Sequence, residues 1–237
     1  MWMRTNGGRT MYVTLSTDPE PAFQASVNDP LCDARFRTRN QRRVETGTHL
    51  FREGDDADHV YEIKTGMLRL TRVLENGRRQ VIAFGLPGDI VGFPNGDLHH
   101  TDCDVIATAE ILAHRRRALE TGVGDTETHQ RLLNAAMREI SAMQDHFMML
   151  ARKSAMEKVA SFLIVLSQRT GTQIGDYMTY PLPMSRADIA DFLGLTIETV
   201  SRMFTLLRQR GAITLETPHT VLVQDMERLI GASQAVD

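Results

Sequence analysis

The chain has 237 residues, a net charge of −3 and 42% hydrophobic residues, which is typical of a globular protein with room for two modest domains. No apolar stretch approaches the roughly 18 residues that a membrane-spanning helix needs. The first residues lack the charged and apolar regions of an export signal. Two cysteines, Cys32 and Cys103, cannot form a disulfide framework. These features predict a cytoplasmic protein that makes no contact with a membrane.

The first segment, residues 1–41, is expected to be a loose leader. Pro19, Pro21 and Pro30 disfavour long regular structure there. Met11 is an alternative start to Met1, and the residues leave this choice open.

Residues 42–125 have the pattern of a β-rich domain. Between Arg43 and about Arg115, short apolar or alternating runs are separated by Gly, Asp and Asn. The dipeptide Asn76-Gly77 lies between two such runs and predicts a type I′ hairpin, whose two central residues both have positive φ. Closely spaced short strands of this kind predict a small barrel or jelly roll.

Residues 126–152 change to a helical period. Apolar residues follow one another in steps of three and four, as in the seam of a coiled coil. A helix that packs on its own domain also needs such a stripe, but the regular spacing favours a dimerisation helix. The predicted dimer residues are Leu133, Ala136, Ile140, Met143, Phe147 and Leu150.

Residues 153–230 contain a second helix, from about Ser154 to Arg169, and then a helix-turn-helix from about Ser185 to Arg210. Ser185 and Thr196 are good N-caps, Gly194 suits a sharp turn with positive φ, and Gly211 ends the second of the two helices. This pattern is typical of a unit whose second helix enters the major groove. The apolar face of that helix is expected to hold Ile197, Val200, Met203, Phe204 and Leu207, and residues 231–237 are expected to form a tail.

The outward face of the second helix carries groups that suit base edges. Arg202 can bond guanine in a bidentate pair, and Glu198 can accept from cytosine. The remaining outward positions are Thr199, Ser201 and Thr205. A solvated face with an i, i+4 ion pair is the plain alternative, but the caps and the glycine before it favour DNA. Residues 151–210 carry a charge of +3 inside an acidic chain, which agrees mildly with this interpretation.

From about Arg43 to Leu229 the chain resembles the cyclic-AMP receptor protein/FNR (CRP/FNR) superfamily of transcription regulators. The most specific part is Gly194-Leu195-Thr196-Ile197-Glu198-Thr199-Val200-Ser201-Arg202, which is similar to the FNR branch. The resemblance implies an α+β fold with an N-terminal β-roll of the cyclic-nucleotide-binding kind, a long dimerisation helix and a C-terminal winged helix-turn-helix. It implies a homodimer on double-stranded DNA with the palindrome TTGAT-N4-ATCAA.

The resemblance also assigns residues to that DNA site. The implied base contacts are Glu198, Ser201 and Arg202, and the implied backbone or neighbouring contacts are Ser185, Arg186, Thr196 and Thr199. The cyclic-AMP receptor protein has a further base-contacting Arg where this chain has Ile197, which favours the TTGAT type of half-site. In FNR-like activators the hairpin tip contacts RNA polymerase, here Glu75 and Arg78.

The sensor part departs from both well-known members. Cys32 is the one leader cysteine and Leu112 stands where FNR has its β-roll cysteine, so an iron–sulfur cluster is not expected. The stretch Gly88–Glu110 lacks the Arg-Ser pair that holds a cyclic nucleotide phosphate, which disfavours cyclic AMP. A chain with FNR-type DNA-contacting residues but without the cluster cysteines is similar to the FixK branch. That resemblance implies an activator in microaerobic, nitrogen-fixation or anaerobic control, with a regulator gated by an unidentified small ligand or haem as the alternative.

Weaker patterns point to other classes. His99, His100, Asp102, Cys103 and Asp104 suit a transition metal by type, but their spacing favours a polar loop, so we expect no metal and no cofactor. Two rivals are a winged helix that mediates only protein contacts and a cupin-like metalloenzyme. The cupin ligands would be His49, His59, His99 and His100, which lack the required spacing, so no catalytic residue is expected. A redox role for Cys32 or Cys103 stays open.

Overall fold

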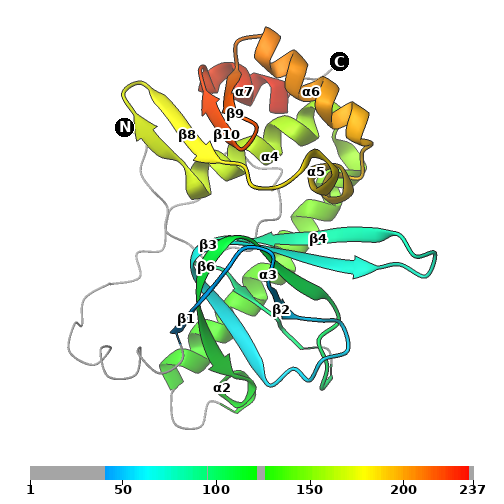
Figure 1. Cartoon of the computed structure of the whole chain (residues 1–237), viewed down its shortest axis with the longest axis vertical. Helices are drawn as coiled ribbons and strands as arrows, with labels where there is room; N and C mark the ends of the chain where they lie inside the picture. Colours follow the sequence, from blue (N-terminus) through cyan, green and yellow to red (C-terminus); the bar gives the residue numbers. More distant parts are fainter. Residues whose placement is uncertain (1–40, 95, 122–125, 235–237) are drawn as a thin grey trace. The chain divides into compact units, whose positions relative to one another are not determined.

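The computed structural model describes residues 41–94, 96–121 and 126–234 (Figure 1). Residues 1–40 of the predicted leader, the choice between Met1 and Met11, Cys32 and the last residues of the tail lie outside these ranges. Packing divides the described residues into two compact units. The first unit holds residues 41–72 and 82–141, and the second holds residues 73–81 and 142–234.

The strands of the β-roll confirm the β pattern of the sequence. β1, β2 and β3 pair antiparallel with β6, β5 pairs antiparallel with β3, and β4 follows β3 in the sheet. Fully buried Ile63, Leu68 and Ile111 form part of the core of the roll. The strands are β1 (Gln41–Val44), β2 (His49–Phe51), β3 (His59–Val73), β4 (Arg79–Gly85), β5 (Ile90–Val91) and β6 (Asp102–Arg115).

The turn between β3 and β4 differs from the predicted type I′ turn. Gly77 has φ +76°, but no described residue other than glycine has positive φ, so Asn76 does not adopt the type I′ conformation. The Gly77 N–H donates to the Leu74 carbonyl at 2.8 Å, and the Leu74 N–H donates to the Arg78 carbonyl at 2.8 Å. This is a three-residue loop that ends in a left-handed glycine. The Asn76 side chain accepts from the Arg78 N–H at 3.0 Å, which favours this turn.

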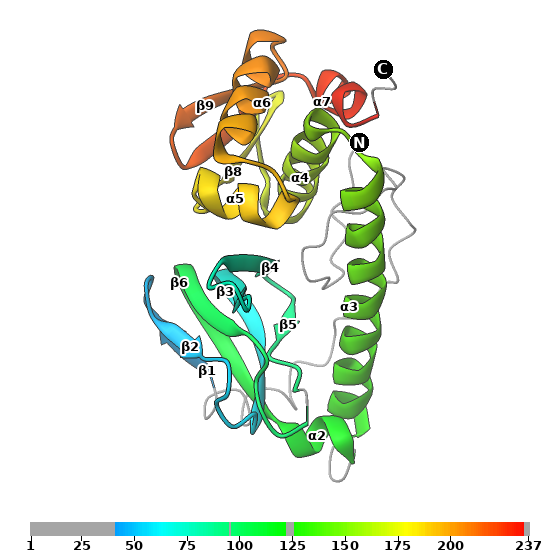
Figure 2. The ribbon, with the colours of Figure 1, turned by 90° about the vertical axis from the view of Figure 1, so that its right-hand side faces the viewer.

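After the short helix α2 (Arg116–Glu120), helix α3 runs without interruption from Thr126 to Arg152 (Figure 2). The helix expected from the apolar period is therefore present over the expected residues. Its buried face, which the sequence analysis did not identify, holds Leu132, Ala135, Ala142, His146 and Met149. Because these residues provide the intramolecular packing, the stripe predicted for the dimer is not needed for it.

The second unit is a winged helix-turn-helix. Its helices are α4 (Ala155–Thr170), α5 (Arg186–Leu193), α6 (Ile197–Gln209) and α7 (Met226–Ser233). Its strands are β7 (Thr172–Ile174), β8 (Tyr177–Pro181), β9 (Ile213–Thr217) and β10 (Thr220–Val223), in the antiparallel order β7-β8-β10-β9. The winged form agrees with the expectation, but the sequence analysis missed β7 and α7. Helix α7 also takes in the first residues of the predicted tail at 231–237.

The α+β class is confirmed, because a β-rich roll precedes helices and a small antiparallel sheet. Helix α4 begins with a capping box between Ser154 and Glu157, which fixes its first turn at the predicted residue. Its buried face includes Phe162, Leu163 and Leu166. Over the ranges that the structure describes, every helix is too short or too polar to cross a membrane.

Candidate nucleic-acid interface

Helix α5, the first helix of the helix-turn-helix, begins at a capping box. The Ser185 hydroxyl accepts from the Asp188 N–H at 3.0 Å and donates to the Asp188 carboxylate at 2.8 Å, and the same carboxylate accepts from the Ser185 N–H at 3.0 Å. Within the same compact unit, Arg79 lies 2.7 Å from the other oxygen of Asp188. The predicted N-cap is confirmed, and most of the bonding capacity of Ser185 serves the helix.

The turn between α5 and α6 has the predicted geometry. Gly194 lies in the left-handed region, with φ +63° and ψ 41°, and its N–H donates to the Ala190 carbonyl. Thr196 then caps α6 by accepting from the Thr199 N–H at 3.2 Å. Its hydroxyl also donates to the Thr199 hydroxyl at 3.1 Å. These local bonds define where the recognition helix starts and which residues its first turn presents.

Helix α6 has one buried and one exposed face. Val200, Met203, Phe204 and Leu207 are buried, as their spacing predicted. Ile197 is different: the sequence analysis placed it on the apolar face, but its side chain is 48% exposed. It is the first residue of the helix, immediately after the Thr196 cap. Ile197 therefore lies on the free side, next to Glu198.

The predicted base-contacting residues Glu198, Ser201 and Arg202 are all exposed on α6. The ion pair between Glu198 and Arg202 that the plain alternative required is not found among the ion pairs of the described residues. The pKa of the Glu198 carboxyl is lowered, mainly by its own backbone N–H and then by the neighbouring Thr196 side chain. The guanidinium of Arg202 is thus not tied to that carboxylate.

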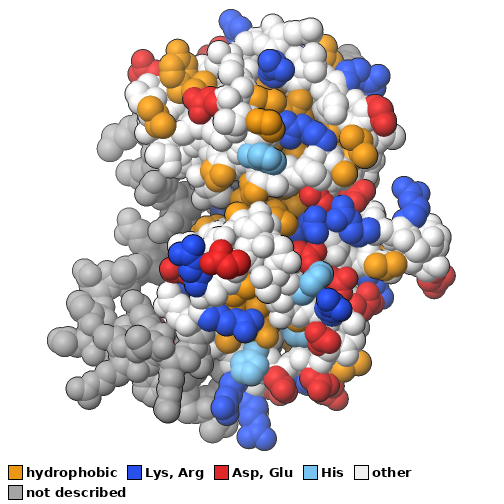
Figure 3. Space-filling model, in the orientation of Figure 1, with side chains coloured by type: hydrophobic (Ala, Val, Ile, Leu, Met, Phe, Trp, Pro, Cys, Tyr) orange, Lys and Arg blue, Asp and Glu red, His pale blue; other side chains and the backbone are white. Residues whose placement is uncertain are grey.

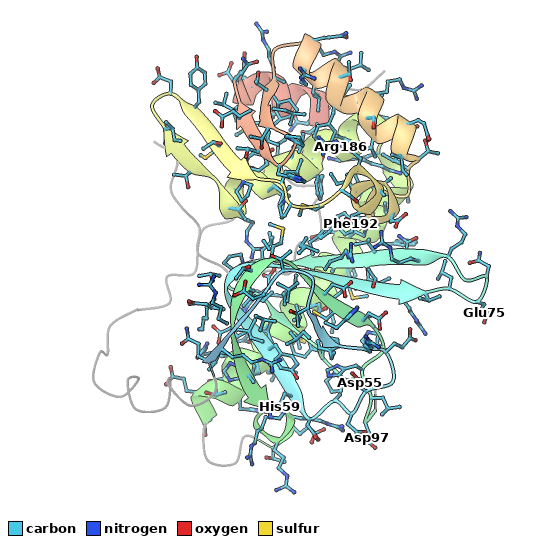
Figure 4. All side chains as sticks on the ribbon, in the orientation of Figure 1. Asp55, His59, Glu75, Asp97, Arg186 and Phe192 are labelled. Carbon is cyan, nitrogen blue, oxygen red and sulfur yellow. The ribbon has the colours of Figure 1, made fainter. Side chains whose placement is uncertain are left out.

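Arg186 is held by an aromatic ring. Its guanidinium carbon lies 3.8 Å from the centroid of the Phe204 ring, a cation–π contact between α5 and α6. Burial lowers the pKa of Arg186. Figure 4 shows Arg186 at the start of α5 and Phe192 near its end. Arg186 therefore helps join the two helices, a role that the sequence analysis did not assign to it.

The charged surface of the chain is mixed. Figure 3 shows Lys and Arg side chains interspersed with Asp and Glu on the face toward the viewer. Around the recognition helix, Arg202, Arg208 and Arg210 are exposed. The sequence analysis did not single out Arg208 and Arg210, although their position at the end of an amphipathic helix could have revealed them. Such residues suit phosphate contacts rather than base selection.

The predicted dimer stripe lies on the free face of α3. Phe147 is 70% exposed, and Ala136 and Leu150 are partly exposed. Met137 and Met148, which were not predicted, extend the stripe. The remaining exposed members are Leu133, Ile140 and Met143. A contiguous row of large apolar side chains of this kind marks a protein interaction surface.

The remaining predicted residues have simpler settings. Glu75 lies at the tip of the β3–β4 hairpin (Figure 4), and both it and Arg78 are exposed. Cys103 is fully buried, and burial raises the pKa of its thiol, which keeps it from being a reactive thiolate.

The histidines of the weaker patterns have separate settings. His49 lies 2.6 Å from Asp104, and His99 stacks on Phe51 with ring centroids 3.8 Å apart. Among the described residues, no group of three or more His, Cys, Asp or Glu side chains is arranged to hold a metal ion.

Comparison with protein families gives two matches. A Crp-like helix-turn-helix domain matches residues 157–231, and a cyclic nucleotide-binding domain matches residues 41–121. The first covers α5 and α6, and the second covers the β-roll.

Comparison with individual proteins gives relatives over most of the chain. The nitrogen fixation regulation protein FixK of Azorhizobium caulinodans is 39% identical over 180 residues, covering 74% of this chain and 73% of that protein. The transcriptional activator protein FnrL of Cereibacter sphaeroides is 37% identical over 196 residues, covering 80% and 78%. The structure of FixK2 from Bradyrhizobium japonicum is 33% identical with a TM-score of 0.72, covering 83% of this chain and 98% of that one. The chain belongs to the CRP/FNR superfamily of DNA-binding transcription regulators, in its FixK-like branch.

Proposed function

We propose that this chain is a homodimeric transcription activator that binds the palindrome TTGAT-N4-ATCAA. The observation that carries the proposal is the free face of α6, where Glu198, Ser201 and Arg202 are exposed together. A buried apolar face holds this helix on α5, so the polar face is available to a major groove. Arg202 bonds guanine and Glu198 accepts from cytosine. Exposed Ile197 adds an apolar contact of the kind that thymine methyl groups make.

The free face of α3 supports the proposed dimer. Burying one Phe, Leu, Ile or Met side chain contributes about 1.5–3 kcal/mol, and the stripe offers several of these from each copy. Two copies joined along α3 present two recognition helices, which must lie about 34 Å apart to enter successive major grooves. Regulators of this superfamily are dimers, which agrees with the geometry of the stripe.

The β-roll matches a cyclic nucleotide-binding domain, but its residues do not fit a cyclic nucleotide. The segment from Gly88 to Glu110 contains no arginine to pair with the phosphate. Asp89 is 1% exposed, and its carboxylate accepts from the Leu86 N–H of its own turn at 2.8 Å. His99 is buried against Phe51. We therefore propose that cyclic AMP is not the effector. We also propose that the regulator has no iron–sulfur cluster, because the two cysteines of the chain cannot supply four ligands.

The physiological role rests on the relatives. Proteins named for nitrogen fixation regulation and for transcriptional activation share 37–39% of their aligned residues with this chain. We propose a role in microaerobic or nitrogen-fixation control. The exposed hairpin tip at Glu75 and Arg78 would contact RNA polymerase. Alanine at Arg78 is then expected to lower transcription from a target promoter without lowering DNA affinity, and a parallel loss of both would contradict this.

The base contacts are tested with Arg202→Ala and with Arg208→Ala as a matched control on the same helix. Affinity is measured at one salt concentration for the palindrome and for duplexes with one G·C pair of each half-site replaced. Wild type and Arg208→Ala are expected to lose affinity on the replaced duplex, by about 1–3 kcal/mol per bidentate pair. Arg202→Ala is expected to bind both duplexes equally. If Arg202→Ala still distinguishes them, Arg202 is not the contact.

A further inference from the structure

His146 lies on α3 between the two surfaces that the proposed function uses. It belongs to the buried face of the helix and is 9% exposed, whereas its neighbour Phe147 is 70% exposed. Successive residues of a helix point about 100° apart, so one residue can face the same chain while the next faces a partner. Histidine at this place is unexpected, because Leu132, Ala135, Ala142 and Met149 on the same face are apolar.

The His146 ring packs on the first helix of the reader. Its centroid lies 4.4 Å from that of Phe192, with 21° between the planes. Phe192 in turn lies 5.9 Å from Phe162 of α4, at 55°. Both phenylalanines are fully buried. Rings from α3, α5 and α4 therefore form one cluster, with His146 stacked on Phe192 and Phe162 tilted against it. Each such aromatic pair adds about 0.5–1.5 kcal/mol beyond burial.

The same ring also bonds the backbone of α5. A hydrogen bond with the Phe192 backbone favours the protonated ring, so the imidazole N–H donates and the carbonyl accepts. Phe192 is one residue from the end of α5, where the last four carbonyls of a helix have no partner within the helix. His146 thus satisfies an open carbonyl at the end of the helix and also packs on its ring.

The last turn of α3 also lies close to the turn that follows α5. A β-carbon at Gly194 would lie 3.9 Å from Cδ2 of Leu150, so Leu150 is near the turn between α5 and α6. Thr196 and the base-contacting residues begin two residues later. The packing of α3 near Phe192 and Gly194 therefore also sets the direction in which α6 leaves the turn.

We infer that His146 is a positioning residue for DNA recognition, which fixes the helix-turn-helix to the dimer helix. The inference rests on the proposed homodimer. Two recognition helices bind one palindrome together only if each is held at a fixed angle to the common seam. A helix-turn-helix that is loosely held still binds one half-site. It loses the additional affinity from the second half-site, because that affinity disappears when geometry prevents simultaneous contact.

The first test compares a palindromic duplex with a duplex that carries a single half-site, using the full chain. His146→Ala is expected to lower affinity for the palindrome at least about tenfold and affinity for the single half-site less than about twofold. His146→Phe keeps the stack but loses the N–H, and His146→Asn keeps a donor but loses the stack. Both are expected to fall between wild type and His146→Ala.

The control is Leu229→Ala, which empties a fully buried position on α7 of the same compact unit. It is expected to lower thermal stability without changing the ratio of the two affinities. If Leu229→Ala changes the ratio as much as His146→Ala, or if His146→Ala leaves it unchanged, the inference is wrong. Binding is measured well below the melting temperature of each variant, so that unfolding does not contribute.

A second measurement separates this inference from the proposed function. A spin label on Gln209→Cys at the end of α6, in a Cys32→Ser background, reports the distance between the two readers of a dimer without DNA. Wild type is expected to give one narrow distribution and His146→Ala a broad one. A dimer with an unchanged distribution refutes the role of His146 alone. A monomer refutes the proposed dimer and this inference together.

Discussion

Helices α3 and α6 are both amphipathic in an unusual sense, because each has one face buried in its own chain and one face that is free. The free face of α6 is polar, with Glu198, Ser201 and Arg202, whereas the free face of α3 is apolar, with Ile140 and Phe147. A polar row suits the edges of bases, and an apolar row needs another protein surface. The chemistry of the free face, rather than the helix itself, indicates the partner.

The largest expected effect comes from a substitution that makes the free face of α3 polar, like that of α6. Phe147→Asp places a carboxylate in the apolar stripe, and the dimer contains it twice. Since burying one Phe contributes about 1.5–3 kcal/mol in each chain, the dissociation constant of the dimer should rise at least about a hundredfold. Analytical ultracentrifugation measures this. Ser141→Asp, exposed on α3 beside the stripe, is the control and should remain dimeric. If the Phe147→Asp chain dimerises like wild type, α3 does not form the dimer interface.

The buried face of α3 gives the second prediction. Burial lowers the pKa of His146 to about 4 from 6.5, despite the bond to Phe192, and Lys158 acts in the same direction. Between these pH values the unfolded chain binds a proton that the folded chain does not. The contribution of neutral His146 to the free energy of unfolding is therefore complete above about pH 6.5. It is lost as pH falls toward 4, by on the order of 3 kcal/mol. His146→Phe should gain stability relative to wild type as pH falls from 7 to 5.

Denaturant unfolding at several pH values measures this difference. The comparison with wild type is needed because Glu139 acts in the opposite sense. Burial, and then the nearby Asp89, raise the pKa of Glu139 to about 7 from 4.5. Its contribution is present at low pH and is lost as pH rises through 7. A His146→Phe curve parallel to that of wild type would show that His146 is not held neutral.

A smaller change concerns the free face of α6. Ile197→Arg introduces at the start of α6 a group that can pair with guanine. Preference for TTGAT half-sites over TGTGA half-sites should fall by about 1–3 kcal/mol per half-site. Competition binding with the two duplexes gives the value. Ile197→Val, which keeps an apolar side chain, should change the preference little, and an unaltered preference in Ile197→Arg would place residue 197 away from the bases.

The smallest expected effect tests the cap that starts this face. Thr196→Ala removes the acceptor of the Thr199 N–H and should lower the free energy of unfolding by about 1 kcal/mol. Thr196→Ser keeps an acceptor and should be close to wild type. Thermal unfolding distinguishes them. Equal stability of the two variants would mean that the cap is not needed for the helix.

The helix-turn-helix was largely predictable from the sequence because the residues that determine it act locally. Ser185, Gly194 and Thr196 act within three or four residues, and their roles in the two caps and the turn are confirmed. The positions of Ile197 and Asn76 were predicted wrongly. Ile197 is exposed because it begins its helix, and Asn76 is held by a side-chain bond in a different turn.

Other features depend on tertiary packing, which a periodic pattern does not reveal. The buried face of α3 follows the same steps of three and four as the dimer stripe. Glu139 and His146 occupy positions in it, and they hide the period because they are polar. The cation–π contact between Arg186 and Phe204 joins residues of different helices and has no sequence pattern. The cluster of the His146, Phe192 and Phe162 rings is unpredictable for the same reason.

The central claim is that paired α6 helices select a palindrome. The most direct measurement is the affinity and stoichiometry of the full chain on a TTGAT-N4-ATCAA duplex and on a scrambled duplex, at the same near-physiological salt concentration. The predicted result is two chains per palindrome and a preference of at least about a thousandfold. Equal affinity for both duplexes, or one chain per palindrome, would contradict the account.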